Sequence, residues 1–234
     1  MLRQSNWVRL PSQRPGSVVD RPRTSCIYVL AGTNGAGKSG LAGAAFLEAG
    51  VVFFNPDAAA RRIQSANPGI TQEQANSAAW RQGKRLLQRA IAERLNFAFE
   101  TTLGGETMTA LLEMAIFEQL EVRIWYAGLQ HPELHIQRVQ ARVAKGGHDI
   151  PENRIRTRYD SSRLNLIRLM PRLTELRVFD NSKEADPHKG RAPEPVLLLH
   201  MSGGRIVTSC ELIKTPEWAK PIMAAAMRLA TAEA

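Results

Sequence analysis

The stretch "GTNGAGKS", residues 32–39, decides the fold of this chain, because it fits the pattern G-x-x-x-x-G-K-[ST]. The apolar run "CIYVLAG", residues 26–32, comes directly before it and predicts a buried strand. The sequence "SGLAGAAFLEAG", residues 39–50, follows and predicts a helix that ends at a Gly50 C-cap. A strand, a glycine-rich turn and a helix in this order are typical of a loop that binds nucleotide phosphates.

Each residue type in this loop has a part in phosphate binding. Glycine lets the backbone curl so that successive N–H groups point at phosphate oxygens, and the helix presents its positive N-terminus to the same anion. Lys38 can reach the β- and γ-phosphates, and the Ser39 hydroxyl can bind the Mg²⁺ that bridges them. The predicted ATP-binding residues of the loop are Gly32, Thr33, Asn34, Gly35, Ala36, Gly37, Lys38 and Ser39.

A dinucleotide site is the rival interpretation of these glycines. Asp57 follows the next predicted strand, about where a ribose-binding acid would lie. The glycines, however, run G-x-x-G-x-G before a lysine and not G-x-G-x-x-G. The order favours ATP or GTP over NAD, so ATP and Mg²⁺ are the expected cofactors.

Strands and helices alternate along most of the chain. Further strands are predicted at 51–55, 97–100, 122–129 and 176–182, and helices at 71–95 and 106–120. The first of these helices opens with a T-x-x-Q capping box at Thr71 and Gln74. One face of it carries Ala79, Gly83, Leu86 and Ala90. The pattern predicts an α/β fold of the P-loop nucleoside triphosphate hydrolase or kinase type, with a mainly parallel sheet covered by helices on both faces.

We expect one P-loop kinase domain, residues 26–234, after a basic and flexible leader, residues 1–25. Within the domain, an arginine-rich helical lid is expected at about 132–170. The segment 194–232 is predicted to add a hairpin that turns at Gly203-Gly204 and a closing helix.

Composition narrows the class of protein. The chain has 234 residues, of which 44% are hydrophobic and 23% charged, so it can bury a sizeable core. The formal charge of +9 comes from residues 1–25, with +4, and residues 138–177, with +6, which leaves −1 for the remainder. No apolar run suggests a membrane span or a signal peptide. Cys26 and Cys210 have no C-x-x-C pattern or histidine nearby in the sequence, which is typical of ordinary thiols in a reducing compartment. A cytoplasmic protein is therefore expected.

Carboxylates are expected where two strands end. Asp57 lies after the second predicted strand, close to the phosphate loop, and could accept a proton from an acceptor hydroxyl; its alternative role is to cap the next helix. Glu100 ends the third strand and Thr102 follows it, so they could bind sugar hydroxyls. A structural role for Glu100 is the alternative.

Arginines cluster on two predicted helices that Gly146-Gly147 joins. Arg138, Arg142 and Lys145 share a face of the first helix. The second is predicted to start at an Asp149 N-cap. On this second helix Arg154 and Arg158 share one face, Ile155, Tyr159, Ser162 and Leu166 share another, and Arg156 points off the arginine face. Arginines on a mobile lid can neutralise the charge of a phosphoryl transition state, whereas a solvated helix face is the alternative.

In order, "GTNGAGKS", "NPD", "FAFETT", "YAGL", "RVQARVAKGGHDIPENRIRTRY" and "FDNS" resemble the zeta toxin family of P-loop kinases over about residues 26–182. The resemblance implies that ATP phosphorylates UDP-N-acetylglucosamine on its sugar, and that an antitoxin protein blocks the ATP site. The substrate is the property that follows least directly from a family resemblance, because related folds serve different chemistries.

The resemblance also implies roles for single residues. Asp57 would be the general base, Glu100 and Thr102 would hold the substrate, and Arg142 and Arg154 would clamp the γ-phosphate beside Lys38. Arg138 and Arg158 are further candidates for ATP binding, Arg156 is a lesser one predicted to be ordinary surface, and Asn181 would border the adenine.

Two other functions stay open. The chain could phosphorylate another hydroxylated molecule or nucleotide, or it could be an ATP-dependent binding or regulatory module without phosphate transfer. A membrane partner is not expected. Base stacking on nucleic acid is disfavoured, because Tyr159 is the aromatic residue that the basic segment offers.

Overall fold

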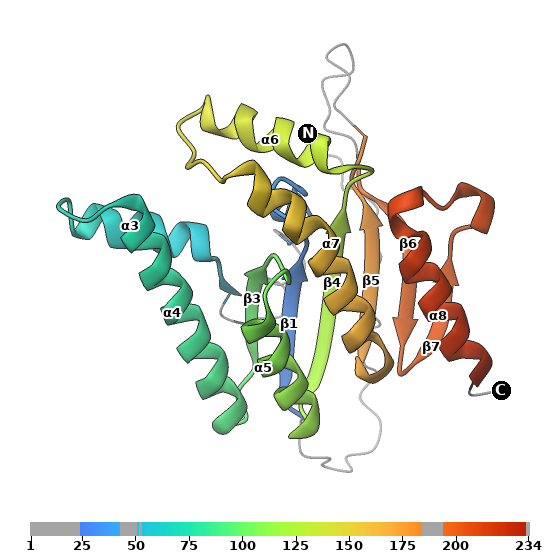
Figure 1. The fold of residues 1–234 in the computed structure, drawn as a ribbon. Coiled ribbons are helices and arrows are strands. Elements are labelled where there is room, and N and C mark those ends of the chain that lie inside the picture. The colour runs from blue at the N-terminus through green and yellow to red at the C-terminus, as the bar shows by residue number, and fades with distance from the viewer. Residues whose placement is uncertain (1–23, 43–50, 52, 184–193, 233–234) are drawn as a thin grey trace, which may run out of the picture.

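The computed structural model describes residues 24–42, 51, 53–183 and 194–232. A seven-stranded sheet in the order β2-β3-β1-β4-β5-β6-β7 forms its centre (Figure 1). The strands are β1 (Cys26–Ala31), β2 (Phe53–Phe54), β3 (Phe97–Thr101), β4 (Glu121–Gly128), β5 (Glu175–Asp180), β6 (Val196–Ser202) and β7 (Arg205–Ser209). The first five are parallel, whereas β6 and β7 continue the sheet in antiparallel pairs. The predicted mainly parallel sheet is therefore confirmed.

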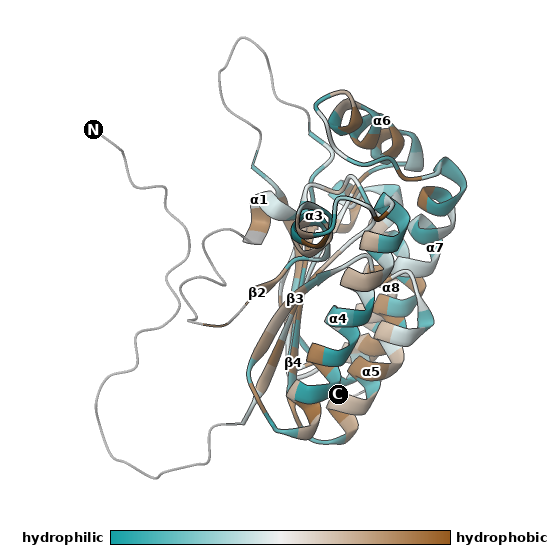
Figure 2. Cartoon of the chain, turned by 90° about the vertical axis from the view of Figure 1, so that its left-hand side faces the viewer, coloured by the Kyte–Doolittle hydropathy of each residue, from teal (hydrophilic) through white to brown (hydrophobic). Residues whose placement is uncertain are grey.

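Helices lie on both faces of this sheet. They are α1 (Lys38–Ala42), α3 (Pro56–Ala66), α4 (Gln72–Ala92), α5 (Glu106–Phe117), α6 (Pro132–Val143), α7 (Glu152–Leu169) and α8 (Lys220–Ala232). Figure 2 shows α4, α5, α7 and α8 on one face and α1 on the other. Helix α6 crosses the end of the sheet where the parallel strands finish (Figure 1). None of the helices in the described residues is both long and apolar enough to cross a bilayer.

The central strand β1 forms the middle of the core. Ile27, Val29 and Ala31 are fully buried under the layer of α4, α5, α7 and α8, and Leu30 is fully buried on the other face with Leu41 of α1. Burial on both faces explains why the strand reads as a continuous apolar run. The phosphate loop that follows is thus anchored to the most buried strand.

The capping box of α4 is confirmed. Gln74 N donates to Thr71 Oγ1 at 3.2 Å, and Thr71 N donates to Gln74 Oε1 at 2.8 Å. Of the predicted face, Ala79, Gly83 and Ala90 are buried, but Leu86 is half-buried and its neighbour Leu87 is fully buried.

Two helix starts differ from expectation. The alternative role of Asp57 as a helix cap is wrong, because Asn55 Oδ1 accepts from Ala58 N at 2.9 Å and Pro56 occupies the first helical position. The predicted Asp149 cap is also wrong. Helix α7 begins only after Pro151, because a proline keeps the residue before it out of the helical region.

The C-terminal segment has the predicted hairpin and helix. The turn at Gly203 and Gly204 has φ of +54° and +78°, which glycine adopts without strain. Trp218, just before α8, packs on the end of β4 and donates from Nε1 to Asp180 Oδ1 at 3.1 Å. The predicted leader and the Gly50 cap lie outside the described residues, apart from residues 24 and 25.

The contact between Gly128 and Trp218 predicts a measurable coupling. A Cβ at Gly128 would lie 2.3 Å from two ring carbons of Trp218, so Gly128→Ala should destabilise the fold by about 1–3 kcal/mol through overpacking. Trp218→Ala should remove this penalty in the double variant, giving a non-additive cycle in urea unfolding. If the two changes in the free energy of unfolding were additive, Gly128 and Trp218 would not be in steric contact.

Candidate active site

The phosphate loop, residues 32–39, curls at the carboxyl end of β1 and leads into α1. Gly32, Gly35 and Gly37 have φ of +137°, +82° and +76°, values that other residues rarely adopt. Ala36 N donates to Thr33 O at 3.1 Å and closes the turn. These dihedral angles explain why the pattern needs glycine at these places.

Neighbouring backbone presses on the loop from two sides. A Cβ at Gly32 would lie 2.2 Å from Ala127 O of β4, and one at Gly35 would lie 2.5 Å from His135 O of α6. Backbone atoms cannot move aside as a side chain can. The loop therefore fits against β4 and α6 only because it has no side chains there.

Lys38 ties the loop to the ends of two strands. Its buried Nζ donates to Gly32 O at 2.7 Å and to Thr33 O at 3.3 Å, and it lies 3.5 Å from Glu100 Oε1 at the end of β3. Glu100 Oε2 in turn accepts from Asn55 Nδ2 at 2.9 Å. The alternative, structural role of Glu100 is therefore realised in part, since it links β3 to the start of α3.

Asp57 lies in the first turn of α3 and faces the helix pair α6 and α7. Its Oδ2 is 3.3 Å from Arg142 Nη1, and its Oδ1 is 3.9 Å from His148 Nε2. Arg142 Nη2 also donates to His148 O at 3.2 Å, and its stem passes against Gly147. The Gly-Gly turn thus wraps the arginine that pairs with Asp57.

A cavity of about 480 Å³ opens between α3 and the turn after α6. Its lining residues are Asp57, Arg61, Arg138, Ala141, Arg142, Lys145, Gly146, Gly147 and His148. Four cations and one carboxylate line it, so it suits an anionic ligand. It is at the same end of the sheet as the phosphate loop.

The other arginines divide into two groups. Arg158 Nη1 donates to Asn34 Oδ1 of the phosphate loop at 2.8 Å, and desolvation followed by the charge of Arg154 lowers its pKa. Arg138 Nη2 donates to Lys183 O at 3.2 Å, and its Nη1 would lie 3.9 Å from a Cβ at Gly37. Arg154 and Arg156 are exposed instead.

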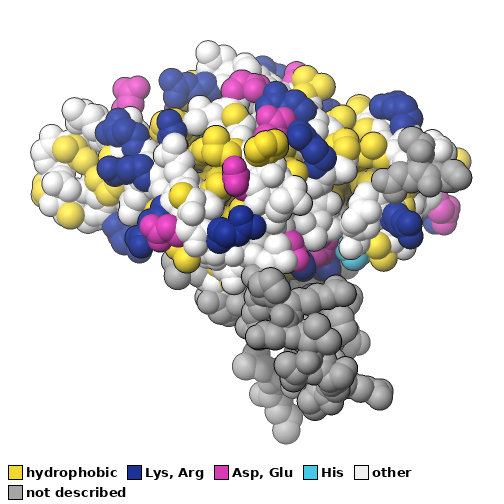
Figure 3. All heavy atoms as spheres, turned by 90° about the horizontal axis from the view of Figure 1, so that it is seen from below, with side chains coloured by type: hydrophobic (Ala, Val, Ile, Leu, Met, Phe, Trp, Pro, Cys, Tyr) yellow, Lys and Arg dark blue, Asp and Glu magenta, His cyan; other side chains and the backbone are white. Residues whose placement is uncertain are grey.

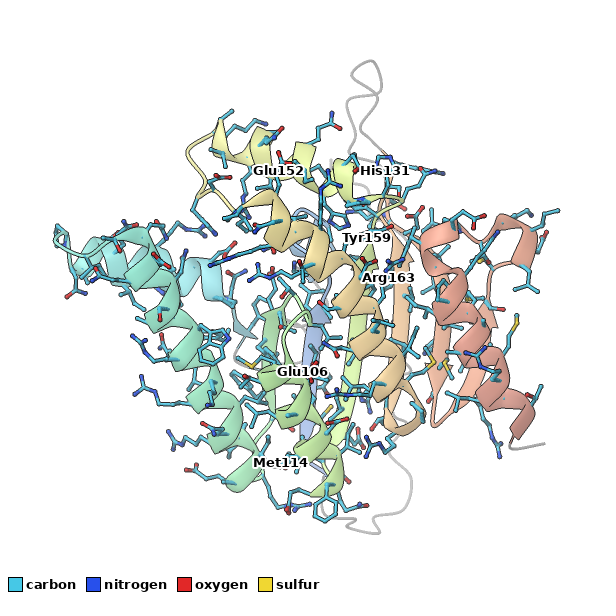
Figure 4. All side chains as sticks on the ribbon, in the orientation of Figure 1. Glu106, Met114, His131, Glu152, Tyr159 and Arg163 are labelled. Atoms are coloured by element: carbon cyan, nitrogen blue, oxygen red, sulfur yellow. The ribbon has the colours of Figure 1, made fainter. Side chains whose placement is uncertain are left out.

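Arg156 pairs with Glu133 on the surface, with Nη1 2.6 Å from Oε1. This agrees with its expected place off the arginine face of the helix. Tyr159, also on α7, donates from its hydroxyl to Gln130 O at 3.0 Å, and the guanidinium of Arg163 lies 4.1 Å from its ring centroid (Figure 4). Tyr159 thus connects α7 to the segment before α6.

Thr102 begins the loop between β3 and α5, which α7 holds in place. Ser162 Oγ donates to Thr102 O at 2.7 Å, and Asn165 Nδ2 donates to Leu103 O at 2.9 Å. Leu103 has φ of +55°, a conformation that costs a non-glycine residue of order 1–3 kcal/mol. Hydrogen bonds from α7 offset this cost and fix the place of Thr102.

Asn181 reaches the phosphate loop from the end of β5. Its Nδ2 donates to Ala36 O at 2.9 Å, and a Cβ at Gly37 would lie 2.3 Å from the same nitrogen. The structure therefore places Asn181 against the loop, which leaves its predicted role at the adenine a prediction.

His135 is a residue of this site that the sequence did not single out. Its buried Nδ1 lies 2.8 Å from Asn34 O, so the neutral ring donates to the phosphate loop. Burial is the main cause that lowers its pKa to about 4, and the charges of Lys38, Arg138 and His131 add to it. In the sequence, His135 is recognisable as a histidine on the apolar face of a predicted helix. Such a position does not distinguish a contact with the phosphate loop from ordinary core packing.

The strand, the phosphate loop, the buried lysine and the acids at the strand ends define the class as an ATP-dependent P-loop kinase. The chain belongs to the Zeta toxin family, whose model matches residues 14–191. A Haemophilus influenzae (strain ATCC 51907 / DSM 11121 / KW20 / Rd) protein described as uncharacterised is 33% identical over 129 residues, which cover 55% of this chain and 88% of that protein.

Solved structures share the fold. The complex of AvrRxo1-ORF1 with AvrRxo1-ORF2 gives a TM-score of 0.60 at 15% identity, covering 88% of this chain and 71% of that chain. The PezAT toxin-antitoxin system of Streptococcus pneumoniae gives a TM-score of 0.50 at 11% identity, covering 90% and 87%. At these identities the likeness is one of fold.

The buried His135 predicts a pH effect on stability. Because its folded pKa is about 4 and its usual value 6.5, the unfolded chain takes up a proton in this window that the folded chain does not. His135→Asn, which keeps a donor for Asn34 O, should therefore lose less stability than the natural chain when the pH falls from about 6.5 to about 4.

The measurement is urea unfolding at several pH values, and His131→Asn is the matched control. His131 is an exposed residue that caps α6 through Nδ1, a role that asparagine can also fill. This control shows how much of the pH dependence the loss of an exposed capping histidine changes, and His135→Asn should change it more. Equal pH dependence of His135→Asn and the natural chain would contradict a neutral buried ring.

Proposed function

We propose that this kinase transfers the γ-phosphate of ATP to a sugar hydroxyl of UDP-N-acetylglucosamine, with Asp57 as the general base. The observation that carries the proposal is the carboxylate of Asp57, which pairs with Arg142 in the wall of a cationic cavity at the same end of the sheet as the phosphate loop. Membership in the Zeta toxin family supports the choice of a nucleotide sugar.

In the proposed reaction the acceptor hydroxyl gives its proton to Asp57, and its oxygen forms a bond to the γ-phosphorus. The bond between that phosphorus and the oxygen that bridges to the β-phosphate breaks, and ADP leaves with the electron pair. A positioned carboxylate contributes about a hundredfold to ten-thousandfold to such a proton transfer. Glu100 and Thr102 would bind other hydroxyls of the sugar from the end of β3.

Cations from three elements would balance the charge of the phosphates. Lys38 would turn from the carbonyls that it now contacts toward the β- and γ-phosphates. Arg138 and Arg158 already contact or border the phosphate loop, and Arg142 and Arg154 would bind γ-phosphate oxygens when the helix pair closes. Gly146, with φ of +85°, would serve as part of the hinge.

Arg142 would have two partners during turnover. In the structure its Nη1 lies 3.3 Å from Asp57 Oδ2, so the two side chains form an ion pair. A γ-phosphate would attract Arg142 and leave Asp57 free to accept a proton. Binding of the γ-phosphate and release of Asp57 from its ion pair would thus be linked through the side chain of Arg142.

The residues after Lys38 fit a magnesium ion bound with the nucleotide. Ser39 is exposed at the first turn of α1, and its hydroxyl is of the type that binds Mg²⁺ in P-loop enzymes. When bound, Mg²⁺ would neutralise charge on the β- and γ-phosphates.

An antitoxin that covers the ATP site is the partner we propose. Two structures with the same fold were solved with an accompanying protein or as a toxin-antitoxin system. We further propose that the reaction takes place in the cytoplasm, where ATP is available.

Removal of the base or the loop lysine should slow transfer strongly. Asp57→Asn should lower kcat about a hundredfold to ten-thousandfold, and Lys38→Ala at least as much, because each group acts on charge that develops during the reaction. The assay incubates the protein with ATP, Mg²⁺ and UDP-N-acetylglucosamine and detects a mass gain of one phosphate. Transfer at the natural rate by Asp57→Asn would exclude Asp57 as the base.

The arginines on α7 give a graded test. Arg154→Gln should lower kcat by about a hundredfold or more, since it removes one donor to the transferring phosphate. Arg158→Gln should mainly raise the KM for ATP, because Arg158 already contacts the phosphate loop. Arg156→Gln is the matched control. Because Arg156 pairs with Glu133 on the surface, this variant should keep the natural kcat and the natural KM for ATP. If Arg154→Gln behaved like the control, Arg154 would lie outside the site.

A further inference from the structure

The cavity beside Asp57 holds more positive charge than the proposed transfer step uses. Of its four cations, Arg142 is paired with Asp57, and Arg138 lies toward Gly37 and donates to Lys183 O. Within the described ranges, the side chains of Arg61 and Lys145 form no hydrogen bond or ion pair with any residue. Both are exposed at the rim of the cavity.

Arg61 and Lys145 come from elements that face each other. Arg61 is four residues after Asp57 on α3, so the two side chains lie on the same side of that helix. Lys145 follows α6 in the turn that wraps Arg142, three residues beyond it. The proposed general base Asp57 therefore has one cation, Arg61, a turn further along its own helix and another, Lys145, on the opposite wall of the cavity.

Like charges gathered around one cavity repel each other unless an anion is bound among them. The ATP phosphates do not account for this anion, since no residue of the phosphate loop, 32–39, lines the cavity. Arg138 borders the loop and the cavity at once, which puts the nucleotide phosphates on one side of it and Arg61 and Lys145 on the other.

We propose that Arg61 and Lys145 form a second anion subsite, which binds a phosphate or diphosphate group of the acceptor while its hydroxyl lies at Asp57. Arginine suits this task because its planar fork can bind two phosphate oxygens, and lysine adds a compact charge. This rests on the proposed function for the placement of the hydroxyl. It makes Arg61 and Lys145 determinants of acceptor specificity.

Binding of inorganic pyrophosphate tests the subsite without turnover. The full chain is first saturated with Mg²⁺ and a non-hydrolysable ATP analogue, so that the phosphate loop is occupied, and pyrophosphate is then titrated by calorimetry. Arg61→Gln and Lys145→Gln should each weaken its binding about tenfold, and higher salt should weaken it in the natural chain. Arg62→Gln is the matched control, because Arg62 is an exposed arginine on the same helix that does not line the cavity.

Absence of pyrophosphate binding to the saturated chain would overturn the subsite. So would equal affinities in Arg61→Gln, Lys145→Gln and the Arg62→Gln control. Thermal unfolding of the three variants checks that each is folded, and since all three positions are exposed, their midpoints should agree.

Kinetics separate failure of the subsite from failure of the proposed acceptor. Arg61→Gln and Lys145→Gln should raise the KM for UDP-N-acetylglucosamine about tenfold and keep kcat and the KM for ATP, whereas the KM for neutral N-acetylglucosamine should not change. If the natural chain phosphorylates the nucleotide sugar and these variants keep its KM, the subsite is wrong and the proposed function stands. If it phosphorylates neither sugar but binds pyrophosphate through Arg61 and Lys145, the acceptor is wrong and the subsite stands.

Discussion

The close contact between the phosphate loop and the backbone around it is the constraint on which the rest of the site depends. Gly32 lies against β4 and Gly35 against α6, so strand and helix meet the loop with no side chain between them. His135 and Arg158 then hold the two oxygens of Asn34, one from each helix of the pair. A movement of α6 or α7 would therefore disturb these contacts with the phosphate loop.

The same helix pair also positions the residues that we propose for acceptor binding. Helix α7 holds the strained Leu103 and the carbonyl of Thr102, and the turn after α6 wraps Arg142 beside Asp57. These contacts are polar, and α7 adds an apolar interface through Leu166 and Leu169, which are fully buried in the main core. Ile136, Val139, Ile150 and Ile155 form a core cluster of their own in this pair. This small core involves α6, the turn after it and the start of α7, whereas the later part of α7 belongs to the main core of the domain.

Local patterns predicted the sheet, the phosphate loop and the capping box, because each depends on residues close in sequence. They failed where a neighbour competed: Pro56 made Asn55 the cap in place of Asp57, and Pro151 delayed α7 past Asp149. His135 was missed because its partner Asn34 is 101 residues away, and no periodicity reports such a contact. The family resemblance, not the pattern, supplied the roles of the single arginines.

The structure also explains where the positive charge of the internal segment lies. Arg168, Arg172 and Arg177 pair with glutamates, and Figure 3, seen from the end opposite the phosphate loop, shows basic and acidic side chains interspersed. Ion pairs of this kind cancel each other's field at a distance, so they add little attraction for a ligand. At the cavity, by contrast, Arg61 and Lys145 form no ion pair with an acid among the described residues, and Asp57 is the one carboxylate that lines the cavity with them. With four cations and one carboxylate, the cavity keeps a net positive charge at the end of the sheet where Asp57 lies, and a cleft of predominantly positive charge raises the local concentration of anionic substrates.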